Sequence, residues 1–173
     1  MRRILLMLPL ALVAFALAPV AAASAANTVS GECTVSGSAS FTPNGLQGTP
    51  QTLGYNFSGT GTCSGTLNGT PITNAPVSAN ASGSGTLSCA GAVSTGGTGS
   101  IAFTGQGVSV GFGIDLVGTG SEVEFVLTGN GGGAGVGHAT FATNGARAIE
   151  CANPSGLNNL GFEIQAAAAN LTG

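Results

Sequence analysis

The residues that could do chemistry in this sequence are few, and three of them are carboxylates that lie close together. Asp115, Glu122 and Glu124 belong to the segment GVSVGFGIDLVGTGSEVEFVLTG, residues 107–129. If residues 118–121 form a hairpin turn, Asp115 faces Glu124 across it and Glu122 lies one step along the same face. Ca²⁺ takes about six to eight oxygen ligands, so we predict a candidate calcium site here, although no calcium-loop motif is present. The simpler interpretation is that the three carboxylates are only solvated.

The same acidic hairpin and the single histidine are the candidates for catalysis. Glu122 and Glu124 could form the carboxylate pair of a glycosidase, and His138 could act as a general base with Asp115 or a serine as its partner. The chain has no tryptophan and one tyrosine to stack on a sugar, and no G-x-S-x-G nucleophile motif. We therefore predict no catalytic residue and no cofactor apart from the possible Ca²⁺. A secreted hydrolase that uses Asp115, Glu122, Glu124 or His138 is the alternative.

The N-terminus indicates export from the cell. It reads MRRILLMLPLALVAFALAPVAAASA, in which two arginines precede an apolar run that ends in small residues. This order is typical of a secretory signal peptide, so we assign residues 1–25 to it and residues 26–173 to a single domain. No second apolar stretch approaches the roughly 20 residues of a transmembrane helix. The mature protein is therefore predicted to be secreted and to have no transmembrane segment.

The cysteines fit an oxidising compartment. An even number of cysteines in an exported chain indicates disulfide bonds, here two, between Cys33, Cys63, Cys89 and Cys151. Three pairings are possible. We favour Cys33 with Cys63 and Cys89 with Cys151, because sequence neighbours more often become spatial neighbours. In the chain-entropy model each bond would contribute roughly 3.5 to 4 kcal/mol to stability.

The charge of the chain excludes some partners. Without the signal peptide, Arg147 is the only Lys or Arg and stands against six acidic residues, which leaves a net charge of −5. A surface with one cation cannot neutralise phosphates, so we expect neither nucleic acid nor anionic lipid as a partner. The lysine-free composition, rich in Ala and Gly, indicates a bacterial protein.

The repeated alternation of residue types predicts an all-β fold. Residues 33–41, 55–67 and 77–89 place apolar residues or glycine at odd positions and mostly Ser, Thr or Asn at even positions. A period of two is typical of a half-buried strand with one wet face. Turn residues between such runs predict an antiparallel β-sandwich, or a small barrel, of roughly eight or nine short strands. Inner glycines are expected where an opposing layer approaches or a strand bends.

The strongest hairpin signal is the pair Asn144-Gly145, which lies between ATFAT and ARAIEC. This turn would make His138 a surface residue of a strand, across from Cys151. The AAAA segment at residues 166–169 could form a brief helical turn.

These observations favour a secreted, non-catalytic protein. Nearly every reactive residue type is absent or occurs once. We therefore expect an extracellular interaction or structural role at the bacterial cell envelope, with a partner that the sequence does not identify.

Overall fold

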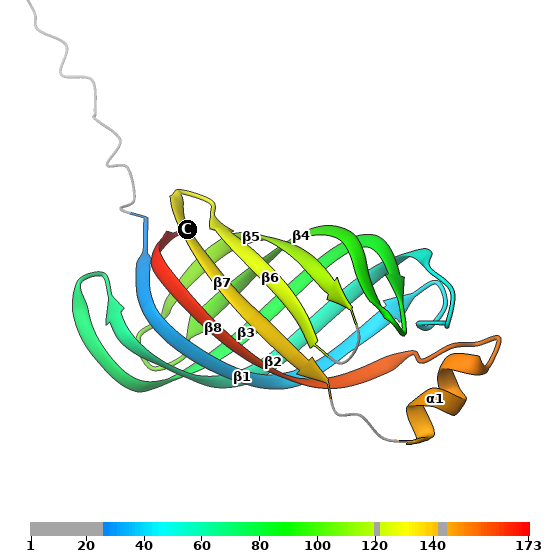
Figure 1. Ribbon diagram of the computed structural model, residues 1–173. Helices are drawn as coiled ribbons and strands as arrows, with labels where there is room; N and C mark the ends of the chain where they lie inside the picture. Colours follow the sequence, from blue (N-terminus) through cyan, green and yellow to red (C-terminus); the bar gives the residue numbers. More distant parts are fainter. Residues whose placement is uncertain (1–25, 120–121, 142–144) are drawn as a thin grey trace, which may run out of the picture.

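The computed structural model is a closed barrel in which each strand is antiparallel to the next and β8 pairs with β1 (Figure 1). It describes residues 26–119, 122–141 and 145–173. The strands, with helix α1 between the last two, are β1 (Thr28–Thr42), β2 (Gln51–Leu67), β3 (Thr70–Ser88), β4 (Gly91–Phe103), β5 (Val108–Thr119), β6 (Glu122–Gly129), β7 (Gly132–Phe141), α1 (Gly145–Ala152) and β8 (Asn159–Thr172).

The all-β, antiparallel prediction is confirmed, and of its two alternatives the chain forms the barrel. The strands are longer than expected, up to 19 residues in β3, because the alternation continues through the glycines. The predicted signal peptide, residues 1–25, lies outside the described part of the chain. Within that part, no helix has the length and apolar character needed to cross a membrane.

The period-two pattern separates an apolar inner face from a polar outer face. Strand β6 alternates exposed and buried residues along its whole length. In β2, Leu53 and Tyr55 are buried, whereas Asn56, Ser58 and Thr60 are exposed. Because a strand points successive side chains to opposite faces, this pattern gives one lumen and one solvated surface.

Both predicted disulfides are confirmed. Cys33 and Cys63 face each other directly across β1 and β2, with their Cα atoms 4.1 Å apart. Cys89, in the turn between β3 and β4, bonds to Cys151 of α1 over a Cα–Cα distance of 6.2 Å. The first bond therefore links neighbouring strands, and the second fixes the helix to the barrel.

The predicted hairpin at Asn144-Gly145 is wrong. Asn144 lies outside the described residues, and Gly145 begins α1. Residues 145–152 contain three alanines with one Arg and one Glu, which are good helix formers. His138 consequently faces Gln165 of β8 instead of Cys151. The AAAA segment is also not helical, because β8 is hydrogen-bonded to a neighbour on each side.

The register of the acidic hairpin differs from the prediction by two residues. Asp115 faces Val126, and Glu124 faces Val117, so Asp115 and Glu124 are not opposite each other. A shift of two leaves every side chain on its predicted face, because strand faces alternate with a period of two. The observed register also removes the direct pairing of two like charges.

The inner glycines accommodate large side chains from the strand beside them. Phe112 faces Gly99, and Phe125 faces Gly137, each directly across a strand pair. A methyl group added to Gly99 would lie 2.6 Å from Cε2 of Phe112, which shows that the ring leans over the neighbouring backbone. The sequence analysis expects inner glycines where an opposing layer approaches or a strand bends. At Gly99 and Gly137 no opposing sheet approaches, and a ring from the neighbouring strand lies there instead. These glycines are recesses in a single curved wall.

We predict that Gly99→Ala destabilises the barrel by about 1–3 kcal/mol, because the new methyl group would lie 2.5 Å from the backbone oxygen of Asn80 and 2.6 Å from Cε2 of Phe112. Urea denaturation measures this change in the free energy of unfolding. Gly105→Ala is the matched control, since a methyl group there meets no atom within 4 Å. We expect it to alter stability by less than about 0.5 kcal/mol. Equal losses of stability in Gly99→Ala and Gly105→Ala would contradict the conclusion that Gly99 forms a recess in the wall.

We also predict that the paired replacement Cys33→Ala and Cys63→Ala lowers the free energy of unfolding by roughly 3.5 kcal/mol. The Cys89→Ala and Cys151→Ala pair should cost roughly 4 kcal/mol, because its bond closes the longer loop, with a sequence separation of 62 against 30. Urea midpoints before and after reduction with dithiothreitol check both values. A midpoint that reduction leaves unchanged would refute the stabilising role of the bonds.

Candidate functional site

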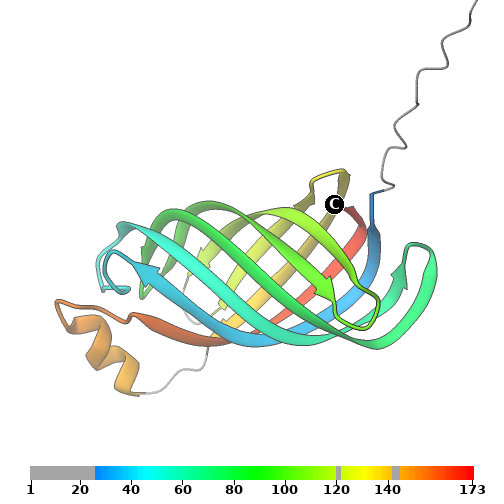
Figure 2. The same ribbon diagram turned by 180° about the vertical axis from the view of Figure 1, so that it is seen from behind.

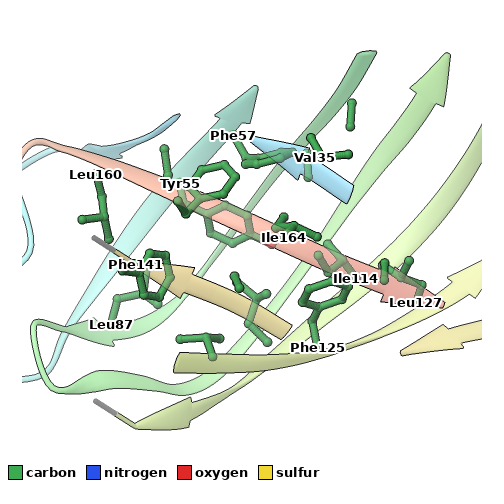
Figure 3. Close-up of a pocket in the computed structure, with 18 of the residues that line it drawn as sticks. Val35, Tyr55, Phe57, Leu87, Ile114, Phe125, Leu127, Phe141, Leu160 and Ile164 are labelled. Atoms are coloured by element: carbon green, nitrogen blue, oxygen red, sulfur yellow. The ribbon is translucent and has the colours of Figure 1, made fainter. Parts of the chain in front are cut away.

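The lumen of the barrel is not filled by side chains and contains a cavity of about 500 Å³ (Figure 3). All eight strands contribute to its wall, and the lining is almost entirely apolar. Small-molecule sites commonly have volumes of about 300–1,000 Å³ and mainly hydrophobic linings with few polar groups. The cavity therefore has the size and character of a site for a small apolar molecule.

Aromatic and branched side chains form the middle of the cavity wall. The rings of Phe57 and Phe162 lie with their centroids 4.4 Å apart, and Phe141 meets Phe162 edge-on at 6.4 Å. Phe57, Phe141 and Ile164 point into the barrel and yet are only partly buried, because they border the open lumen (Figure 3). These side chains provide a flat apolar surface for a ligand.

The cavity exists because many inward positions carry small residues. The interior of an eight-stranded barrel is just wide enough to be filled by side chains or to hold one small ligand. Here Ala79 and Ala81 of β3, and Ala166 and Ala168 of β8, line the lumen without reaching its centre. The glycine recesses add to this effect, since they let rings such as Phe112 lean along the wall.

A plug covers the end of the cavity at which α1 lies. Leu46 and Leu157 form an isolated two-stranded bridge with reciprocal backbone hydrogen bonds of 2.9 and 2.8 Å, and both side chains are buried against the cavity. The Cys89 amide donates to Gln47 O at 2.8 Å. The Cys89–Cys151 disulfide ties the other half of the plug to the same turn. We call residues 45–48 and 151–157 the plug.

The opposite end of the barrel is packed by side chains. Both views place α1 at one end of the barrel and the start of β1 and the end of β8 at the other (Figure 1, Figure 2). Near the chain ends, Leu67, Phe103 and Val110 are buried in the core and do not line the cavity. The barrel core therefore borders the cavity at one end, and the plug borders it at the other.

Tyr55 contributes the one buried polar side-chain atom without a hydrogen-bond partner among the residues that the structure describes. Its hydroxyl is buried and has no hydrogen-bond partner, while its ring lines the cavity. A methyl group added to Gly83 would lie 2.7 Å from this hydroxyl, so the oxygen rests against bare backbone. Leaving such a group unpaired costs about 1–3 kcal/mol. By contrast, Ser88, which also lines the cavity, accepts a hydrogen bond from Ala90 N at 3.2 Å.

The predicted calcium ligands lie on the outer surface, away from the cavity. Asp115, Glu122 and Glu124 are all exposed, and none of them lines the lumen. Within residues 26–119, 122–141 and 145–173, no three His, Cys, Asp or Glu side chains form a group that could hold a metal ion. Calcium binding at these residues stays a prediction.

His138 and the acidic residues give no catalytic arrangement with the cavity. His138 lies on β7 directly opposite Glu124 of β6 and is partly buried on the outer face of the wall. The side chain of Arg147 lies outside the described part of α1. Of the residues predicted from chemistry, the structure therefore brings only Glu124 and His138 face to face.

The cavity itself was missed from the sequence, although a signal for it was present. In residues 33–41, 55–67 and 77–89 the odd positions are predicted to form the inner face, and they contain many Gly and Ala residues. When the side-chain volumes of such an inner face are added up around a closed barrel, they do not fill the centre of the lumen. That inference requires the number of strands and their closure, which the alternation does not provide.

Comparison with known proteins assigns no family to the chain. A scan against protein-family models finds no match, and searches of curated proteins and of solved structures find none either.

We predict that Tyr55 titrates at an unusually high pH in the folded protein. Burial, and secondarily the nearby Asp115 carboxylate, raise the pKa of Tyr55 above its usual value of 10.0. Because Tyr55 is the only tyrosine, phenolate absorbance reports this group alone. The folded midpoint should exceed that in urea, and Asp115→Asn should lower the folded midpoint.

The raised pKa of Tyr55 should also make the stability of the protein depend on pH. Since the folded pKa is the higher one, the contribution of Tyr55 is fully present below pH 10.0 and is lost as the pH rises through the folded pKa. Phenylalanine cannot ionise, so Tyr55→Phe should lose less stability than the wild type as the pH rises above 10.0. Urea denaturation at a series of pH values measures this difference. Equal midpoints for folded and unfolded wild-type protein would contradict the buried position of the hydroxyl.

Proposed function

We propose that this protein binds a small apolar molecule in the lumen of its barrel and carries it outside the cell, without catalysing a reaction. The observation that carries the proposal is the cavity of about 500 Å³ with an almost wholly apolar lining. Transfer of apolar surface from water into such a site is favourable by about 25 cal/mol per Å². The polar outer face keeps the barrel hydrated while the ligand is enclosed.

The extracellular location is part of the proposal and is supported by two features. The N-terminal sequence has the order of a signal peptide, and all four cysteines are paired in disulfides. Disulfides persist in oxidising compartments and are rare in the cytosol. The extracellular interaction role predicted from the sequence thus becomes the capture of an apolar compound.

The hydrolase alternative has less support. Its candidate residues, Asp115, Glu122, Glu124 and His138, lie on the outer surface and do not reach the cavity. A glycosidase needs a cleft that positions the sugar between its two carboxyl groups. We therefore propose binding and not hydrolysis as the function.

The proposal predicts that a bulky residue inside the lumen abolishes binding, whereas the same residue outside does not. Ala166 and Ala167 are neighbours on β8, and Ala166 lines the cavity while Ala167 is exposed on the outer face. Ala166→Phe should weaken binding of the neutral fluorescent probe phenylnaphthylamine by about tenfold or more, equivalent to about 1.4 kcal/mol. Fluorescence titration measures the dissociation constants.

Ala167→Phe is the matched control and should bind the probe as the wild type does. Circular dichroism and thermal melting establish that both variants are folded. Failure of the wild type to bind any apolar probe would refute the proposal. Equal weakening by both substitutions would show that the probe binds elsewhere.

A further inference from the structure

The unpaired hydroxyl of Tyr55 has no structural role that the described residues explain. It is the one buried side-chain nitrogen or oxygen among them without a hydrogen-bond partner, and the Tyr55 side chain is 5% exposed. A phenol can both donate and accept a hydrogen bond, and a buried polar group is normally paired. A phenylalanine would fill the same space without this cost. The hydroxyl therefore marks a place where a ligand can supply the missing partner.

The hydroxyl oxygen exposes less than 1 Å² of surface, so a ligand atom reaches it only when neighbouring side chains move aside. Tyr55 packs in one cluster with Leu53, Leu87, Val123, Leu160 and the two plug leucines. These neighbours are aliphatic, and Phe41, Phe141 and the two disulfide-bonded cysteines, Cys89 and Cys151, pack against the same cluster. The aliphatic side chains can move toward a ligand without breaking a polar contact of their own. On the remaining side the hydroxyl lies against Gly83 and Gly97, which have no side chains.

The electrostatics of the cavity select against an anionic ligand. Among the residues that the structure describes, the cavity lining contains no Lys, Arg or His side chain that could pair with a buried carboxylate. Burying an unpaired charge is strongly unfavourable. Asp115 adds to this effect from outside the wall, because its carboxylate raises the pKa of Tyr55 and its negative field therefore reaches the hydroxyl. A neutral oxygen avoids both penalties.

We propose that the ligand is a neutral apolar molecule with a carbonyl or hydroxyl oxygen, and that Tyr55 Oη hydrogen-bonds to that oxygen. This inference rests on the proposed function and adds the chemical class and orientation of the ligand. The oxygen lies near the plug, where Tyr55 packs beside Leu46 and Leu157. The hydrocarbon part extends past Phe57 and Ile164 toward the chain ends (Figure 3).

The test compares an n-alkane, a methyl ketone and a fatty carboxylate of equal chain length in displacing phenylnaphthylamine. It uses the wild type and Tyr55→Phe. The informative quantity is the ratio of ketone to alkane affinity, because the change in this ratio between the two proteins cancels the solubility of each ligand. We expect the ratio to fall about tenfold in Tyr55→Phe, since one hydrogen bond to a buried donor is lost. Alkane affinity should stay the same.

Phe57→Leu is the control for a change of shape in the lumen. Phe57 lies on the same strand and lines the same cavity, but it carries no polar atom. Its replacement should change ketone and alkane affinities together and leave their ratio within about twofold of wild type. In the wild type, the carboxylate should displace less probe at neutral pH than the ketone does at the same concentration.

The outcomes separate this inference from the function on which it rests. An unchanged ketone-to-alkane ratio in Tyr55→Phe, with the probe and alkane still bound, overturns the role of Tyr55 but leaves the binding function intact. A carboxylate that displaces the probe better than the ketone overturns the neutral class of ligand. If none of the probes binds to the wild type, the proposed function itself fails.

Discussion

The structure depends on the closure of a single sheet, which gives eight strands one shared interior. In a sandwich, a second sheet would fill the space above each apolar face. In this barrel the apolar faces of all strands point at each other across the lumen, and only their own side chains can fill it. The volume of those side chains, summed around the ring, therefore decides whether the protein has a solid core or a cavity.

The distribution of large and small residues gives the barrel both a packed core and a cavity. Close to the chain ends, Phe103, Val110 and Leu171 are almost fully buried and form a core that does not open into the cavity except at Leu171. Further along, alanines and glycines alternate with rings that lean over the neighbouring strand, and the centre remains open. A barrel with a packed end and a hollow middle can stay folded while its lumen accommodates a guest.

The two disulfides have different positions relative to this hollow. Cys33–Cys63 lies within the wall and ties two strands that the ladder already pairs. Cys89–Cys151 holds the plug, which is also attached to the barrel by the Cys89 and Gln51 hydrogen bonds and by two buried leucines. Interior side chains that are too small to pack densely make such cross-links more important, because each bond restricts the unfolded chain.

The sequence by itself determined that the chain forms strands with an inner and an outer face, because this depends on local alternation. It favoured the cystine pairing that the structure shows, because of proximity along the chain, but left two other pairings possible. It did not determine the two-residue register at Asp115, since either register leaves the same faces inside. It also misassigned residues 145–152, where the disulfide partner and the pairing of β7 with β8 outweigh a local turn signal. The cavity and the unpaired Tyr55 hydroxyl were decided only by the tertiary structure. An empty volume and a missing partner are properties of the closed ring, and residues far apart in the sequence define them together.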